Sequence, residues 1–360
     1  MEFWNDKTNN AVLIVVAVMV AFFLLGKPVM MDDGFQYQGF TEALARGHLD
    51  FRSFYGFQGL SFFAVPVYWL TRSPISIIIT SMIFSLLSIP LAYAIGKRFG
   101  SGILGLVIFL LTPYPYVTMM RGFQEAALLF FILLIIYGAL EKKNWTGLAW
   151  GIGGIVKPFT FVLFPLFFRK GMKKIEIWCL MLGIFIVGAY AVANYVQTGH
   201  FVTLAATGAY QGPFDPNNVP SLGKSFTLDW KTWARVPANL FVATRKIMVS
   251  PLLIMLGMIA IRKKFILPVI LNILLVGAIT YAFPKYLLPA TTLLSFSAIP
   301  LLVRFPIMVP LILIDSISVF MPIYAFFGHN FWNPIAFYLP FALALALYVY
   351  TYYHPDAQRV

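Results

Sequence analysis

The sequence predicts an all-α, polytopic integral membrane protein with about twelve transmembrane helices. Hydrophobic residues make up 60% of the 360 residues, and the mean hydropathy is +0.84, which excludes an ordinary soluble domain. Apolar runs long enough to cross a bilayer recur along the whole chain. These runs are continuous rather than alternating, which argues against a β-barrel. We treat residues 1–360 as a single transmembrane domain.

Positive charge is concentrated in short clusters between the apolar runs. The formal net charge of +13 could suggest nucleic-acid binding, but clusters spaced in this way are typical of the positive-inside rule. We therefore place the clusters, with Arg304, Arg359 and both termini, on the cytoplasmic side. The clusters are Lys97-Arg98, Lys142-Lys143, Arg169-Lys170, Lys173-Lys174 and Arg262-Lys263-Lys264.

The first crossing, Ala11–Met30, is predicted to run outward as a retained anchor, because no small-residue cleavage site follows it. Residues 32–73 then form a first external loop that carries interfacial helices. One of these helices is indicated by an apolar stripe at Tyr37, Phe40 and Leu44, and Gly47 would end it.

The stretch Leu60–Leu70 is too short to cross the membrane, and its aromatic residues favour the outer interface. Three crossings follow, at Pro74–Gly96, Ile103–Val117 and Glu125–Leu140. Each is bounded by a basic cluster or by a short polar turn, which fixes its direction.

Residues 145–168 are predicted to form a helix pair that is broken at Lys157-Pro158. A single helix here would place Arg169 outside, and proline disfavours helical geometry at the residue before it. We therefore expect two short helices that meet near Lys157 in a V opening at the outer face. The alternative is one kinked helix that spans the membrane, with mixed charges in its loops.

The second half of the chain continues the pattern around one long external loop, residues 197–245, which is rich in glycine and proline. Ile177–Tyr195 leads into this loop. The remaining predicted crossings are Lys246–Ile261, Phe265–Tyr281, Tyr286–Val303, Pro306–Tyr324 and Ala336–Tyr352.

The predicted topology brings several rare polar residues to the outer face. Acidic residues number only 13, and ionisable residues at the edge of a bilayer are functional candidates by default. Carboxylates suit the removal of a proton from a hydroxyl group, and lysine and arginine suit phosphate. The candidates are Asp32, Asp33, Arg121, Glu125, Lys157, Lys285 and Tyr286.

Each candidate also has a structural interpretation. Asp32 and Asp33 could cap a helix that starts at Gly34, and Glu125 could favour a helix N-terminus through its charge. Lys157 could snorkel from a kink, and Asp315 could form a polar bond between helices. The four histidines show no metal-ligand spacing, so we assign no metal and require no cofactor; a divalent cation has no support in the sequence.

The order of these motifs resembles the GT-C superfamily of polyprenyl-phosphate-sugar-dependent glycosyltransferases, of the protein mannosyltransferase or aminoarabinose transferase type. The resemblance begins with Asp32-Asp33-Gly-Phe-Gln-Tyr37 and Ala45-Arg46-Gly47, followed by Pro66-Val-Tyr68-Trp-Leu70. It continues with the acid of Arg121-Gly-Phe-Gln-Glu125 and with the glycine-rich helix Gly151-Ile-Gly-Gly-Ile-Val-Lys157. The late turn Lys285-Tyr286-Leu-Leu-Pro289 completes it.

The resemblance implies transfer of a hexosyl or pentosyl group from a polyprenyl phosphate to an acceptor hydroxyl, with inversion, on the extracytoplasmic face. Asp32, or failing it Asp33, would be the catalytic base, and Glu125, the third catalytic residue, would position the sugar or the acceptor or tune the base through like-charge repulsion. Lys157, Lys285 and Arg121 would bind the donor phosphate, and Tyr37, Tyr55 and Tyr286 would contact substrate. The membrane would be the cytoplasmic membrane of a prokaryote or the endoplasmic reticulum, and a lipid, a polysaccharide or a protein would accept the sugar.

Two other classes of function remain open at this point. A transporter or lipid flippase could use Lys157, Glu125 and Asp315 as an intramembrane pathway. A structural membrane subunit would leave the acid pair and Lys157 unexplained.

Overall fold

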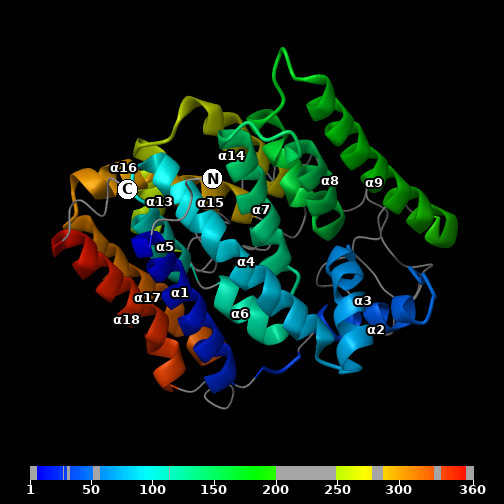
Figure 1. Ribbon diagram of the computed structural model, residues 1–360, viewed down its shortest axis with the longest axis horizontal. Helices are drawn as coiled ribbons and strands as arrows, with labels where there is room; N and C mark the ends of the chain where they lie inside the picture. The colour runs from blue at the N-terminus through cyan, green and yellow to red at the C-terminus, as the bar shows by residue number, and fades with distance from the viewer. Residues whose placement is uncertain are drawn as a thin grey trace.

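The computed structural model describes residues 6–26, 28–30, 33–51, 57–112, 114–199, 249–277, 287–327 and 334–353. Within these ranges the regular elements are all helices and no strand occurs, so the all-α prediction is confirmed there (Figure 1). The long external loop predicted at 197–245 lies almost entirely outside the described residues.

Among the described residues, two helices are long and apolar enough to cross a membrane by themselves. They are α4 (Ser76–Phe99) and α9 (Lys174–Thr198). Much of α9 is exposed, including Phe185 and Val196, which are 69% and 74% accessible. Soluble proteins rarely expose such a continuous apolar face, so this surface is suited to lipid.

The helix α4 lies at the centre of the bundle (Figure 1). It packs against α5 (Gly102–Leu110) and α7 (Glu125–Leu140), and α1 (Asp6–Leu25) packs beside it. The single helix predicted over 103–117 is wrong, because α5 ends at Leu110 and α6 (Tyr114–Arg121) follows separately. Pro113 and Pro115 lack the N–H groups that would continue α5.

Three glycines allow α8 (Thr146–Val156) to lie directly against α9. A Cβ atom on Gly151 would overlap the backbone of Gly183, and a Cβ on Gly147 would lie 2.7 Å from the Cα of Leu180. Small residues at such crossings let two helix backbones approach closely, which is how helices associate in membranes. The 3-10 helix η1 (Pro158–Leu166) follows α8.

The described C-terminal helices are α13 (Pro251–Ile259), α14 (Lys263–Gly277), α15 (Leu288–Ser297), α16 (Ile299–Arg304), α17 (Met308–Phe327) and α18 (Pro334–Tyr353). Three of them, α15, α16 and α18, pack against α4 or α5, and the others pack around them. The one helix predicted over 286–303 is two helices in the structure, because α15 ends before Ala298 and Pro300, in the first turn of α16, has no N–H group to continue it. Figure 1 shows α1 beside α18, which also contacts α17.

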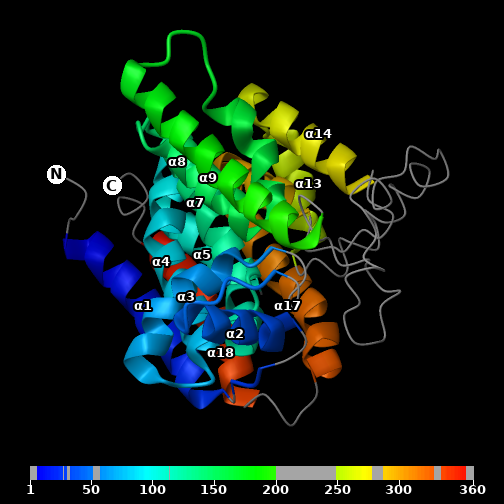
Figure 2. The same ribbon diagram turned by 90° about the vertical axis from the view of Figure 1, so that its right-hand side faces the viewer.

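Two short helices, α2 (Asp33–Ala45) and α3 (Gly59–Thr71), pack together at one end of the bundle (Figure 2). The predicted stripe residues Tyr37 and Phe40 are buried, but Gln38 is buried as well, which the apolar pattern does not indicate. Its side-chain oxygen accepts hydrogen bonds from Ser76 Oγ at 2.9 Å and from the Ile77 N–H at 3.2 Å. Gln38 thereby satisfies a hydroxyl and a backbone N–H at the buried start of α4 and fixes α2 to it.

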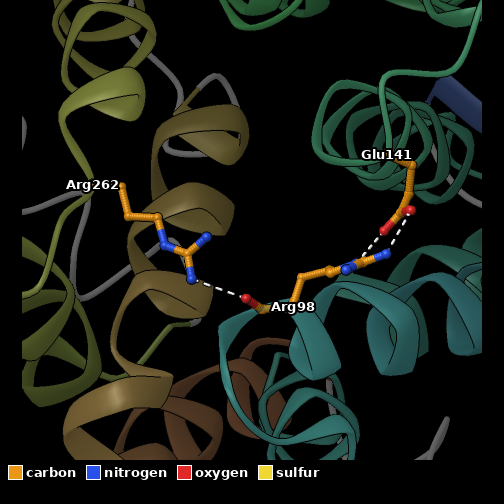
Figure 3. A network of polar contacts seen from close by, with 3 residues as sticks. All are labelled: Arg98, Glu141 and Arg262. Carbon is orange, nitrogen blue, oxygen red and sulfur yellow. Dashed lines mark hydrogen bonds and ion pairs between the residues drawn. The ribbon is translucent and has the colours of Figure 1, made fainter.

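Basic side chains gather at the opposite end, which we call the basic end. Its members are Lys97, Arg98, Lys142, Lys143, Arg169, Arg262, Lys263 and Lys264. Figure 3 shows Arg98 in a bidentate pair with Glu141, with Nη2 2.7 Å from Oε2, while Arg262 donates to the Arg98 carbonyl oxygen at 2.9 Å. These contacts tie the last turn of α4 to the end of α7 and to the link between α13 and α14.

Candidate active site

A buried ion pair between Lys157 and Glu125 marks the centre of the candidate site. The Lys157 ammonium lies against Glu125 Oε1, and the two side chains are 8% and 3% exposed. Removing both charges from water is costly, and a pair with hydrogen bonds recovers part of that cost. Two ionised groups in such a buried position are therefore candidates for a functional role.

The ammonium reaches this position because the chain changes from α-helix to 3-10 helix at Lys157. Its backbone is extended, with φ −154° and ψ 137°, and Pro158 begins η1. The preceding residue of a proline is disfavoured in helical geometry, so the sequence Lys157-Pro158 ends α8 here. Glu125 opposes it as the first residue of α7.

The link between α6 and α7 brings a second charge to the same end. Arg121 is the last residue of α6 and is 1% exposed. Gly122 follows with φ +71°, a left-handed conformation that favours glycine, and a Cβ there would lie 2.7 Å from Ile77. This turn directs α7 back into the bundle with Glu125 at its start.

The start of α2 lies against this link. The Val29 N–H donates to the Met120 carbonyl oxygen at 3.0 Å, and a Cβ on Gly34 would lie 2.6 Å from the Arg121 carbonyl oxygen. Asp33, in the first turn of α2, is therefore held beside the backbone of Arg121. The carboxylate and the buried guanidinium belong to one region of the molecule.

Gln124 joins the elements that surround the ion pair. With its amide nitrogen toward the carbonyl oxygens of Phe57 and Val156, at 2.8 and 3.0 Å, its oxygen accepts from the Tyr37 hydroxyl at 2.8 Å. One buried side chain thus connects α2, the segment before α3, and the end of α8. Gln124 directly precedes Glu125, so these bonds also fix the start of α7.

A second set of contacts clamps the end of the first loop onto α9. The buried hydroxyl of Tyr190 accepts from the Gln58 N–H at 3.0 Å. Gln197 donates to the Leu49 carbonyl oxygen at 2.6 Å and accepts from the Phe51 N–H at 2.8 Å. Sequence reasoning missed Gln124, Tyr190 and Gln197, because their partners lie in distant parts of the chain and no local spacing identifies them.

The structure brings together five of the predicted site residues, all at the α2 end. They are Asp33, Tyr37, Arg121, Glu125 and Lys157. Asp32, Tyr55, Lys285 and Tyr286 lie outside the described residues. Within the described ranges, His, Cys, Asp and Glu side chains do not form a group that could hold a metal ion.

The arrangement of helices resembles that of two solved structures of ArnT. The chain is similar to the crystal structure of ArnT from Cupriavidus metallidurans in the apo state, with a TM-score of 0.59 and 12% identity over 96% of this chain and 76% of that one. ArnT from the same organism bound to undecaprenyl phosphate gives a TM-score of 0.56 and 14% identity over 94% and 69%. At these identities the likeness is one of fold.

No family model matches the sequence, and no curated protein matches it. The exposed apolar surface of α9 is suited to contact with lipid.

Proposed function

We propose that this protein is a membrane glycosyltransferase that moves a sugar from a polyprenyl-phosphate donor to an acceptor hydroxyl, with inversion. The observation that carries the proposal is the buried Lys157–Glu125 pair beside the start of α2, in a fold shared with a protein that binds undecaprenyl phosphate. A cation at this depth is suited to an anionic group that enters from the lipid.

In the proposed reaction, the acceptor oxygen forms a bond to the anomeric carbon while the bond from that carbon to the phosphate oxygen breaks. Asp32 or Asp33 takes the hydroxyl proton. The phosphate leaves with the bonding electron pair, and Lys157, Lys285 and Arg121 stabilise its charge. Glu125 holds the Lys157 ammonium in place, and Tyr37, Tyr55 and Tyr286 contact the substrates.

We further propose that the chain crosses the membrane about twelve times, with the α2 end outside. The gathering of basic residues at the other end supports this orientation, because cytoplasmic ends carry the excess of lysine and arginine. The sugar is a hexosyl or pentosyl group, with a mannosyl donor among the candidates, and the acceptor is a lipid, a polysaccharide or a protein.

The proposal is tested by incubating the purified protein with a panel of polyprenyl-phosphate sugars and scoring transfer or donor hydrolysis. Loss of a general base lowers the rate by about 10² to 10⁴ fold, so we expect such a loss from Asp32→Asn or Asp33→Asn. Glu42→Gln is the matched control, since Glu42 lies on α2 but pairs with Arg46. Full activity in both aspartate variants would contradict the assignment of the base.

A transporter or flippase is the second candidate, and the surroundings of Asp315 bear on it. Asp315 accepts hydrogen bonds from Ser250 Oγ and from the Leu252 N–H, the latter at 3.0 Å, and so caps the start of α13. This structural role accounts for an acid within α17. Movement of labelled lipid or sugar across proteoliposomes without transfer of the sugar would favour the second candidate.

A further inference from the structure

A pocket lies at the basic end, far along α7 and α8 from the candidate active site. It is shallow and open to solvent, and it lies between the end of α7, the start of α8, the segment after η1 and the first turn of α9. Its polar lining consists of Lys142, Lys143, Asn144, Thr146, Arg169 and Glu176. The apolar floor is formed by residues such as Phe167 and Met172.

The pocket carries an excess of positive charge. Arg169 Nη2 lies 2.9 Å from Glu176 Oε1, so that pair is internally balanced. Lys142 and Lys143 are exposed and add two further charges to the lining. Positive charge is crowded beyond the pocket as well, since burial, together with the nearby charges of Arg262 and Lys142, lowers the pKa of Lys264.

Exposed apolar side chains lie near this pocket, before Arg169 and on the outward face of the first turns of α9. Phe168 is 56% exposed directly before Arg169, and Trp178 and Met181 are 65% and 52% exposed on the first turns of α9. Glu176 faces the pocket from the same part of α9. A cationic pocket next to a surface suited to hydrocarbon matches a molecule with an anionic head and apolar chains.

We propose that this pocket binds the phosphate headgroup of an anionic membrane phospholipid, whose acyl chains lie along the exposed face of α9. Lys142 and Lys143 neutralise the phosphate, and Asn144 and Thr146 offer polar groups to the rest of the headgroup. Interfacial Trp178 lies where a headgroup meets its chains. A free phosphate ion would interact only with the positive charges, whereas a phospholipid would also bury its acyl chains against the apolar face of α9. The apolar face therefore favours the lipid.

The position of the pocket gives the bound lipid a role in holding the site together. It joins the last turn of α7 to the first turn of α8, and the opposite ends of these two helices carry Glu125 and Lys157. A ligand that bridges the basic ends of both helices therefore also holds the two partners of the ion pair in register.

The test compares two variants that lose the same charge. Lys142→Gln with Lys143→Gln removes the pocket cations, and Lys97→Gln with Lys263→Gln removes two cations of the same end outside the pocket. Retention of phosphatidylglycerol by the purified proteins is measured by native mass spectrometry after extraction from vesicles of equimolar phosphatidylcholine and phosphatidylglycerol. We expect about 30-fold weaker binding in the pocket variant and wild-type binding in the control.

The other outcomes overturn the proposal. Equal loss in both variants would mean a general attraction of the basic end for anionic lipid. If inorganic phosphate displaces phosphatidylglycerol from the wild-type protein, the pocket is a site for the free anion. If Trp178→Gln retains as much lipid as the wild type, the acyl chains do not contact Trp178. If the double variant fails to fold, Lys143→Gln against Lys263→Gln gives the same comparison.

Discussion

At the scale of single residues, the Lys157–Glu125 pair changes how the outer-face charges are understood. Considered alone, Glu125 could have been an N-terminal helix charge and Lys157 a snorkelling side chain. The structure places them in contact and buries both, which excludes a fully solvated position for either. Each residue is therefore the main reason that the other is tolerated at this depth.

We expect Glu125→Gln to destabilise the protein by about 3–5 kcal/mol, because it leaves the Lys157 ammonium buried without its carboxylate. Thermal unfolding in detergent measures the change. The double variant Glu125→Gln with Lys157→Met should recover most of the stability while transfer stays low. A single variant as stable as the wild type would show that the pair is not coupled.

Gln124 offers a second prediction at this scale. Gln124→Leu removes three hydrogen bonds and leaves the buried carbonyl oxygens of Phe57 and Val156 unsatisfied, at a cost of about 1–3 kcal/mol for each buried group. Tyr37→Phe removes only one of these bonds and should cost about 1 kcal/mol. Stability is measured by thermal unfolding. Equal losses in the two variants would contradict the role of Gln124 in connecting α2, the segment before α3 and the end of α8.

At the scale of elements, hydropathy predicted much of the helix pattern. The breaks within the predicted helices could be predicted only in part. The bounds of α7 agree with the predicted crossing at 125–140, since charged or polar residues end the apolar run on both sides. The chain also changes helix type at Lys157-Pro158. The break between α5 and α6 was missed, because a run of apolar residues hides the effect of its prolines.

The burial of α2 shows why side-chain contacts were harder to predict than elements. Its apolar stripe included Tyr37 and Phe40, which are buried, but it did not include Gln38, which is buried as well. Gln38 is buried because its oxygen accepts hydrogen bonds from the Ser76 hydroxyl and the Ile77 N–H at the start of α4, a distant part of the chain. Partners of this kind follow from tertiary packing and have no local signal.

The contact between α8 and α9 gives a prediction with a control on the same helix. Gly183→Ala places a methyl group against the backbone of Gly147 and Gly151, and overpacking of this kind costs about 1–3 kcal/mol. Gly188→Ala is the matched control, because a Cβ there has no neighbour within 4 Å. Thermal unfolding should separate the two variants, and equal midpoints would show that α8 and α9 can shift apart freely.

At the scale of the whole molecule, the described charges divide between two ends. The α2 end holds buried charges in specific contacts, and the basic end holds lysines and arginines that are mostly exposed. Figures 1 and 2 show α2 and α3 on the side away from α14, which begins with two of those lysines. The basic clusters that are separate in the sequence thus lie together at one end of the described part of the molecule.

The proposed orientation is open to direct labelling. After Cys179→Ser removes the single cysteine, Arg46→Cys at the α2 end should react with an impermeant maleimide added outside sealed vesicles of native orientation. Lys143→Cys at the basic end should react only after the vesicles are opened. The reverse pattern would place the candidate active site on the cytoplasmic side.

The position of the described site along the chain has a consequence for biosynthesis. Every described contact of the site and of its clamp, from Val29 to Gln197, lies before the segment at 200–248 and the six helices from α13 to α18. Because a chain emerges from the ribosome N-terminus first, the lysine and its carboxylate can meet before the last helices are made. Early pairing shields both charges during insertion, so a truncated chain that ends after Thr198 should already contain the ion pair.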